Sequence, residues 1–476
     1  MEDERLPGAQ PPEGGDSAPP DDSRWEEGDS LNFLSAPPAG RPAGEDSRPV
    51  PTARQEPPKK SPAGGTAHPQ PGAETAGEEP PGPLKTNRVI RLAQVRRRRN
   101  ARRLRILVGL TLALTLALAW ALGALAHSLG ALSDLADTVR IGLTPGEGFP
   151  VKTNISPILQ LEELSGGFVE LGEQDLVLYS ASGARLRSIQ HNYSRPALTA
   201  GRTRFCVYAR SGNELRVESR SQTLYTKVTD SPLLLCAMSQ DGGLAVVTRS
   251  ARYAAQVSIY SPRMEYLYGW SPSDKEGTPC LAAFSDNGKK LATACLKAQD
   301  GQLVSGIYFL DTEKSSQPVS SAEVTSMPLQ MAWLDSVQLL VIYQDRATVY
   351  NALTGEEKYS YDFGGESLLS ASISGKNAAL LFSGGTGTFQ DHLVVLDDRM
   401  EPRADLSTEG EADQVVCTRT AAYILEESAV RAYTLGGEEK WTVETEEKPL
   451  ALLDAKKLLL FTGQEAYILQ PSSSSG

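Results

Sequence analysis

After Gly146 the sequence consists of short runs that are either apolar throughout or apolar at every second residue. Residues typical of turns separate these runs, and segments with helical periodicity are nearly absent. Runs of about 4–8 residues that are bounded by Gly, Pro, Asn, Asp or Ser are typical of β-strands. The pattern therefore predicts an all-β domain over residues 146–470, followed by a disordered C-terminus over residues 471–476.

One strand-turn-strand unit recurs in this domain. It reads "AVRAYTLGGEEKWTVE" at 429–444, "DLVLYSASGARLRSI" at 175–189 and "ATVYNALTGEEKYSYDF" at 347–363. In two weaker copies Met264 and Met400 stand near the place of the turn glycine. The copies recur at roughly 35–50 residues, which is the spacing of propeller repeats. The marker positions are Tyr179, Gly183, Tyr260, Tyr350, Gly355, Tyr359, Tyr433, Gly437 and Trp441.

A proline before an apolar run recurs with the same spacing, as in "RPALTA", "SPLLLC" and "MPLQMA". Proline cannot donate to a sheet ladder, so it suits the first residue of a strand. Each unit then holds about four strands, and the last unit lacks one. If "GEGFPVK" at 146–152 supplies that strand, the domain is a single β-propeller of eight four-stranded blades, closed by its N- and C-terminal strands. Seven blades are the alternative.

A long apolar segment precedes the domain. Ile106–Ala126 contains no charged residue, and about 20 apolar residues suffice to span a bilayer as a helix. We predict a transmembrane helix over residues 106–127 and a helical stalk or linker over residues 128–145. A signal peptide fits less well, because its apolar core is usually only ~7–15 residues long.

Residues 85–105 form a basic segment directly before the apolar run. Positive charge is retained on the cytoplasmic side, which predicts a single-pass plasma-membrane protein with a cytoplasmic N-terminus and an extracytoplasmic domain. The same charges would attract anionic lipid. The arginines that carry this prediction are Arg96, Arg97, Arg98, Arg99, Arg102, Arg103 and Arg105.

Residues 1–84 are rich in Pro, Gly and acidic residues and predict a disordered cytoplasmic tail. The stretch "RWEEGDSLNFLS" at 24–35 interrupts this composition with Trp25, Leu31, Phe33 and Leu34. It is either a short motif that folds onto a partner or a set of incidental apolar residues.

These features support a resemblance. "YNALTGEEKYSYDF" and "AYTLGGEEKWTVE" resemble quinoprotein-type (PQQ-like) propeller repeats, in which an aromatic residue follows a glycine by four positions. "FSDNGKKLATA" is similar to a turn of WD40-like propellers. The order of tail, basic flank, anchor and propeller resembles an uncharacterised family of bacterial single-pass membrane-anchored propeller proteins. The resemblance implies the architecture and no particular activity.

Composition and charge limit the partners and the reactive sites that the sequence supports. A formal net charge of −12 argues against a nucleic-acid partner. The five cysteines lie mostly in apolar runs and are expected to be buried free thiols, although Cys280 and Cys295 flank one hairpin and could pair. His191 and His392 lie near turns and are expected to be surface imidazoles. The sequence predicts no catalytic, cofactor or metal site.

Three functions are compatible with these features. The first is a non-enzymatic binding or scaffold module of the cell envelope, with a protein or cell-wall partner on the propeller. The second is a transmembrane sensor that couples an outside ligand to a cytoplasmic partner of the tail. The third is a quinoprotein-like or polysaccharide-acting enzyme. Trp270, Trp333 and Trp441 are expected to pack blades, and they could hold a sugar only if they faced the channel or a rim.

Overall fold

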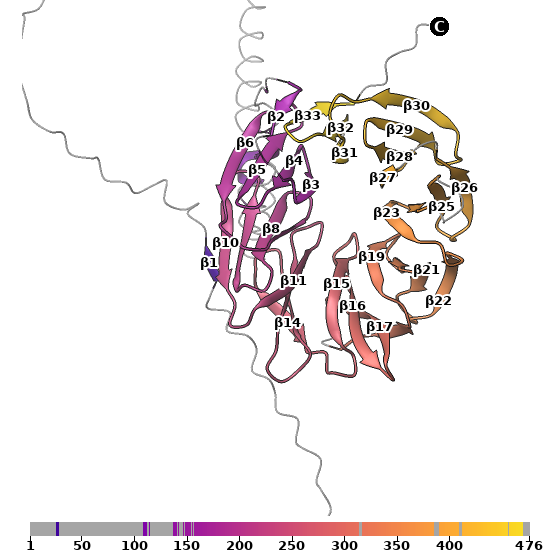
Figure 1. Ribbon diagram of the computed structural model, residues 1–476. Coiled ribbons are helices and arrows are strands. Elements are labelled where there is room, and N and C mark those ends of the chain that lie inside the picture. Colours follow the sequence, from indigo (N-terminus) through magenta and orange to yellow (C-terminus); the bar gives the residue numbers. More distant parts are fainter. Residues whose placement is uncertain are drawn as a thin grey trace, which may run out of the picture. The chain divides into compact units, whose positions relative to one another are not determined.

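The computed structural model contains eight antiparallel sheets that follow one another around a ring (Figure 1). It describes residues 25–27, 108–111, 114, 137–139, 141, 146, 148–153, 155, 157–313, 317–384, 390–408, 412–455 and 457–469. The predicted all-β propeller of eight four-stranded blades is confirmed, and the seven-bladed alternative is wrong.

The first four blades run from residue 160 to residue 324. Blade 1 holds β3 (Gln160–Leu164), β4 (Gly167–Leu171), β5 (Asp175–Ser180) and β6 (Arg185–Gln190). Blade 2 holds β7 (Pro196–Ala200), β8 (Arg204–Ala209), β9 (Glu214–Ser219) and β10 (Thr223–Val228). Blade 3 holds β11 (Leu233–Met238), β12 (Leu244–Thr248), β13 (Gln256–Tyr260) and β14 (Tyr266–Trp270). Blade 4 holds β15 (Thr278–Phe284), β16 (Lys290–Gln299), β17 (Gln302–Asp311) and β18 (Ser320–Val324).

The other four blades complete the ring. Blade 5 holds β19 (Pro328–Trp333), β20 (Gln338–Tyr343), β21 (Arg346–Asn351) and β22 (Glu357–Asp362). Blade 6 holds β23 (Leu368–Ser374), β24 (Asn377–Phe382), β25 (His392–Leu396) and β26 (Pro402–Ser407). Blade 7 holds β27 (Ala412–Cys417), β28 (Ala421–Glu426), β29 (Ala429–Thr434) and β30 (Glu439–Glu444). Blade 8 holds β31 (Ala451–Ala455), β32 (Lys457–Phe461), β33 (Glu465–Ile468) and β2 (Val151–Lys152).

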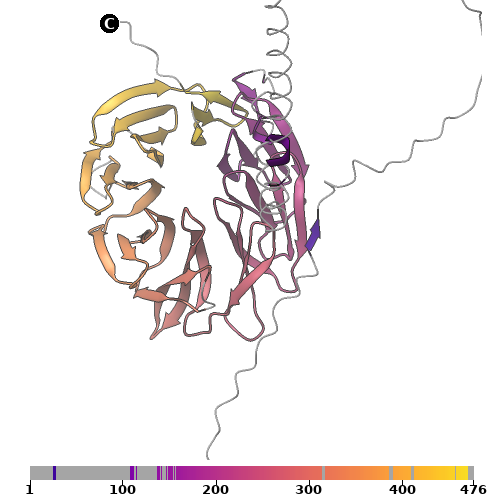
Figure 2. The same ribbon diagram turned by 180° about the vertical axis from the view of Figure 1, so that it is seen from behind.

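Blade 8 joins the two ends of the domain. β2 pairs with β33 through Val151 opposite Ala466 and Lys152 opposite Glu465. The Thr153 N–H extends this pairing by donating to the Gln464 carbonyl at 3.0 Å. Figure 2 shows the yellow C-terminal strands meeting the magenta start of the propeller. This closure is the one expected if "GEGFPVK" at 146–152 supplies the strand that the last repeat lacks.

The apolar core lies between the blades. Each of the hydrophobic clusters combines side chains from two neighbouring sheets, and together the clusters cover all eight contacts around the ring. At the closing contact Phe168 of blade 1 meets Phe461 of blade 8 edge to face, with ring centroids 5.3 Å apart. A β-sheet with two apolar faces needs a cover on each, and neighbouring blades supply both covers.

The innermost strand of each blade begins on one face of the ring and ends on the other. We call these the start face and the end face. Backbone hydrogen bonds link neighbouring blades on the end face, where Ser165 N–H donates to the Arg202 carbonyl and Arg202 N–H donates to the Gln240 carbonyl. The chain also enters the propeller on the end face, because Gly148 lies against Gly183 in the β5–β6 turn.

Asp137–Val139 and Ile141 are helical and belong to the same compact unit as the propeller. Ser221 donates to the Asp137 carboxylate at 2.7 Å, and Arg220 donates to the Thr138 hydroxyl at 2.7 Å. Ser221 and Arg220 belong to the β9–β10 turn on the end face. The segment before the propeller is therefore held on that face.

The second compact unit spans Leu34–Leu132, and only Val108–Thr111 and Leu114 are described there, as helix. Within the parts of the chain that the structure describes, no helix combines the length and apolar character needed to cross a bilayer. Most of the predicted transmembrane helix, residues 106–127, lies outside the described residues. So do the basic segment and its arginines.

A strand from the N-terminal region adds to blade 2. β1 (Trp25–Glu27) pairs antiparallel with β10, with Trp25 opposite Lys227 and Glu27 opposite Tyr225. Blade 2 therefore carries five strands in the order β1-β10-β9-β8-β7. This part of "RWEEGDSLNFLS" pairs with the outer edge of the propeller of its own chain.

One carboxyl group is buried beside the closing contact. Glu170 on β4 is completely buried, and neither of its oxygens has a hydrogen-bond partner. Burial raises the pKa of Glu170 to about 8, and the nearby Thr153 hydroxyl offsets this only in part. That hydroxyl donates to the Gln464 carbonyl at 3.3 Å. The fold therefore holds this group protonated near neutral pH.

We predict that Glu170→Gln flattens the pH dependence of stability. Because the folded state binds the Glu170 proton more tightly than the unfolded state, stability falls as the pH rises from about 4.5 toward 8. The full loss is on the order of 5 kcal/mol, from ~1.4 kcal/mol per pKa unit. The difference in melting temperature between pH 5 and pH 8.5 should shrink in Glu170→Gln. It should be unchanged in the exposed control Glu265→Gln. An unchanged difference in Glu170→Gln would contradict the assignment.

Candidate functional site

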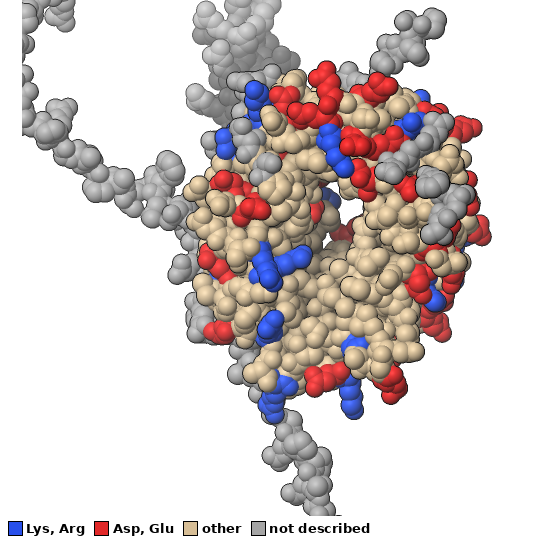
Figure 3. All heavy atoms as spheres, in the orientation of Figure 1, with Lys and Arg blue, Asp and Glu red and all other residues tan. Residues whose placement is uncertain are grey.

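The propeller surrounds a central channel that is open in Figure 3 and bordered mainly by residues other than Lys, Arg, Asp and Glu. The innermost strands β3, β7, β11, β15, β19, β23, β27 and β31 line it. Each of these strands pairs on one side only, so its other backbone edge faces the channel. The channel and its two mouths are the candidate functional site.

Most innermost strands begin with a β-bulge. In β19, for example, Leu329 is an extra residue between the pairs Pro328–Tyr343 and Gln330–Ile342. A bulge leaves one residue unpaired and changes the direction of its side chain. Blade 2 has no such residue. The seven bulge positions, which we call the bulge ring, are Leu159, Leu234, Cys280, Leu329, Leu369, Asp413 and Leu450.

The bulge ring exposes leucines at the start-face mouth. Leu159, Leu329, Leu369 and Leu450 are between 42% and 48% exposed, although each lies at the beginning of a strand whose later residues are largely covered. Asp413 is the charged member, and it pairs with Lys448 at 2.7 Å. Repetition of the blade therefore places four half-exposed leucines around one mouth.

The other exposed apolar residues also lie mostly on the start face. Seven of the ten large apolar side chains that are exposed in the described propeller lie on the start face, and three lie elsewhere. Large exposed apolar patches commonly mark interaction sites. The seven are Leu159, Val228, Leu303, Met327, Leu329, Leu369 and Leu450, and the other three are Leu267, Val319 and Leu353.

Polar side chains of the innermost strands bind the channel edge of the next blade. They satisfy backbone groups that would otherwise be unpaired, and they fix the distance between neighbouring strands. Gln160 accepts from the Leu198 N–H at 2.9 Å and donates to the Leu198 carbonyl at 3.2 Å. Thr199 accepts from Met238 N–H at 3.0 Å, Ser370 from Val415 N–H at 3.2 Å, and Ser372 from Cys417 N–H at 2.9 Å.

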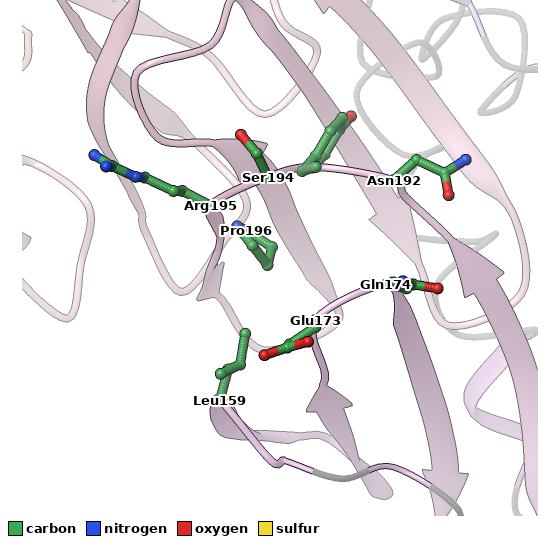
Figure 4. A pocket seen from close by; sticks show the side chains of 8 residues that line it. Leu159, Glu173, Gln174, Asn192, Ser194, Arg195 and Pro196 are labelled. Carbon is green, nitrogen blue, oxygen red and sulfur yellow. The ribbon is translucent and has the colours of Figure 1, made fainter.

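A cleft of about 660 Å³ opens on the start face between blades 1 and 2 (Figure 4). Leu159 of the bulge ring lines it, together with Glu173 and Gln174 from one blade and the loop from Asn192 to Pro196 from the other. We call it the blade 1–2 cleft. It joins the apolar mouth to a polar surface.

The floor of this cleft is fixed by buried groups. Tyr193 N–H donates to Nδ1 of His191 at 3.1 Å, and Nε2 of His191 lies 3.2 Å from the Gly172 carbonyl. These partners require Nε2 to carry the proton, and burial lowers the pKa of His191, so the ring is neutral. The Tyr193 hydroxyl donates to Glu214 at 3.0 Å. His191 is therefore a buried structural residue, and the expectation of a surface imidazole is wrong.

The end-face mouth differs in chemistry. Two cavities of about 560 and 450 Å³ share Glu163, and charged residues of both signs line them, including Arg202, Arg419 and Asp454. Burial raises the pKa of the neighbouring Glu162 to about 7. This mouth is mixed in charge, whereas five of the seven bulge-ring residues at the start-face mouth are leucines.

The remaining reactive side chains are dispersed. His392 contacts Asp405 and lies 3.4 Å from Glu366 through Nδ1. The described residues contain no group of three or more His, Cys, Asp and Glu side chains suited to a metal ion. All five cysteines are free thiols, so the pair Cys280–Cys295 is not formed. Burial raises the pKa of Cys280 to about 11, which keeps that thiol protonated.

The repeat residues lie in the outer half of each blade. Tyr179, Tyr260, Tyr350 and Tyr433 are buried near the ends of third strands. Gly183, Gly355 and Gly437 have positive φ in the following turns, and Met264 and Met400 adopt the same left-handed backbone at equivalent turns. The Tyr179 hydroxyl donates to the Thr153 carbonyl at 3.1 Å and so holds the closing segment.

The aromatic markers are packing residues. Trp270 and Trp333 are buried, and Trp441 packs beside Tyr423 with ring centroids 5.8 Å apart, against a cluster shared by blades 7 and 8. Tyr359 is partly buried against the cluster between blades 5 and 6. Neither Trp270 nor Trp333 presents its ring face at a channel mouth.

The architecture defines a WD40-like eight-bladed propeller with a ring of half-exposed leucines at one channel mouth. The chain belongs to a family of unknown function, DUF5711, whose model matches residues 151–469. No curated protein matches the sequence.

Solved structures share the fold at low identity. The computationally designed Ika8 protein is 12% identical with a TM-score of 0.51, covering 68% of this chain and 98% of its own. Sqt1 from Saccharomyces cerevisiae is 10% identical with a TM-score of 0.50, covering 68% and 100%. BamB from Moraxella catarrhalis is 13% identical with a TM-score of 0.45, covering 68% and 97%. At these identities the likeness to Ika8 and Sqt1 extends to the fold alone.

We predict that Gln160→Ala destabilises the propeller by about 1–3 kcal/mol, because the buried Leu198 N–H and carbonyl both lose their partner. Urea unfolding followed by tryptophan fluorescence measures the change. Gln174→Ala is the matched control, because the Gln174 side chain is exposed and has no partner among the described residues. Equal midpoints for the two variants would show that the hydrogen bonds across the channel contribute nothing.

Proposed function

We propose that this protein is a non-enzymatic binding or scaffold module whose start-face mouth holds a protein partner. The observation that carries the proposal is the bulge ring, in which Leu159, Leu329, Leu369 and Leu450 are each more than two-fifths exposed. Covering apolar surface is favourable by roughly 25 cal/mol per Å², so a partner that covers this mouth gains affinity from it.

The position of the bulge ring supports the proposal. The chain enters the propeller on the end face, and Asp137 and Thr138 contact that face. Among the described residues, the start face carries none of these contacts, and its leucines are exposed. The strongest carboxyl pKa shift lies at Glu170, inside the blades and away from both mouths. No arrangement of described residues favours the enzyme alternative over binding.

We further propose that a single helix over residues 106–127 anchors the propeller outside the plasma membrane. The uncharged run Ile106–Ala126 and the arginines from Arg96 to Arg105 support this topology, and the basic flank would lie on anionic lipid. The pairing of β1 with β10 opposes it, because one crossing separates these two strands. In our proposal the pairing of β1 with β10 forms only in chains whose helix has not been inserted into the membrane.

Thiol labelling of intact cells tests the topology. We expect a membrane-impermeant maleimide to label Thr354→Cys, on an exposed propeller turn, before permeabilisation. We expect Ser30→Cys in the tail to react only afterwards. The unsubstituted protein, with its five native thiols, gives the background. Labelling of both positions in intact cells would refute a single crossing between them.

The binding surface is tested with two matched double variants and a cell-permeant cross-linker. Leu329→Ser with Leu369→Ser should reduce cross-linked partner adducts by about tenfold, since it removes apolar contacts from the centre of the interface. Leu267→Ser with Leu353→Ser changes leucines that are at least as exposed but lie away from the start face, and it should leave the adducts unchanged. Equal adducts from both variants would overturn the proposal.

A further inference from the structure

The blade 1–2 cleft adds polar groups to the apolar mouth. The side chains of Glu173, Gln174, Asn192, Ser194 and Arg195 line it, and none of them has a hydrogen bond or ion pair within the described part of the chain. All five residues are exposed. Their polar groups are therefore available to a ligand without breaking an internal contact.

The cleft is also preorganised. Asn192 has a positive φ of 55°, and the residues on either side of it, His191 and Tyr193, are buried and bonded to each other. Pro196 ends the loop at the start of β7. A loop that is already fixed loses little conformational entropy when a ligand binds. In Figure 4 Asn192 and Arg195 extend from this loop in opposite directions.

The residues around the start-face mouth and the blade 1–2 cleft favour one class of ligand over the others. Glycan sites use exposed aromatic platforms, and Tyr193, the aromatic residue that lines this cleft, is buried. Glu173, whose carboxylate has no ion pair among the described residues, would repel the phosphates of nucleic acid or anionic lipid. Leucines around the mouth beside the amide and hydroxyl groups of the cleft instead match an extended polypeptide, whose apolar side chains alternate with backbone N–H and C=O groups.

We propose that the start face binds an extended segment of a partner protein that runs from the bulge ring into the blade 1–2 cleft. Apolar side chains of the segment lie on the leucines, and Leu159 belongs to both parts of the surface. Gln174, Asn192 and Ser194 hydrogen-bond the backbone of the segment. An acidic side chain of the segment pairs with Arg195 and a basic one with Glu173. This inference rests on the proposed function and adds the class of partner.

Selection from a phage-displayed library of 12-residue peptides tests the inference, with the full-length chain in detergent micelles as the target. We expect the selected peptides to contain at least two apolar residues together with one acidic and one basic residue. Fluorescence anisotropy with the labelled peptides then measures affinity. Both Leu369→Ser and Arg195→Glu should weaken binding by about tenfold or more, which is typical of central contacts.

Two controls make the test specific. Leu353→Ser, on the end-face side, should bind each peptide as the unsubstituted chain does. A peptide whose acidic residue is replaced by Lys should regain affinity for Arg195→Glu, because the ion pair is restored with its charges exchanged. A merely structural effect of Arg195→Glu would not be rescued in this way.

The alternative occupants give distinct results. Equal affinity for Arg195→Glu and the unsubstituted chain overturns the inference, as does the recovery of no peptide. Concentration-dependent dimerisation that is lost in Leu369→Ser, or binding to vesicles of anionic lipid, would assign the face to a second copy or to a membrane. If cross-linked adducts depend on Leu369 while no peptide binds, the proposed function stands and the peptide inference fails. If both tests are negative, both proposals fail.

Discussion

Every blade of this propeller has two apolar faces, and each face must be covered by a neighbouring blade. This requirement determines most of the structure. The hydrophobic clusters bridge consecutive sheets, and the ring is complete only because blade 8 takes its outer strand from the other end of the domain. Tyr179 secures that strand through its hydroxyl. The buried Glu170 opposes closure near neutral pH, so the contact between blades 1 and 8 combines strong apolar packing with an electrostatic cost.

The same ring produces the surface that we assign to binding. An innermost strand has one unpaired edge, and polar side chains such as Gln160 and Ser372 satisfy part of it from the neighbouring blade. The bulges at the strand starts release one residue from regular pairing in seven of the eight blades. Because most of these residues are leucines, a structural irregularity that is repeated around the ring becomes an apolar surface at one mouth.

The sequence predicted the architecture through residues with strong backbone preferences. Gly355 and Gly437 marked turns that need positive φ, and proline marked strand starts. Met264 and Met400 show that buried packing can hold a residue other than glycine in the same conformation. The bulge ring was missed, because a one-residue register shift has no periodic signature. A signal was present, however, since leucine directly follows Pro328 and Pro449 at the strand starts. His191 was misassigned because its partners come from the backbone of Gly172 and Tyr193.

The closure between β2 and β33 has a consequence for how the protein is made. β2 leaves the ribosome early, and its partner is the last strand of the domain. At a synthesis rate of about 5–20 residues per second, the ribosome needs on the order of 15–60 s to make the chain from β2 to β33. Throughout that time one face of blade 1, with Phe168 and Val177, has no cover. Such uncovered apolar surface is prone to aggregation, so the nascent chain is vulnerable until synthesis reaches residue 468.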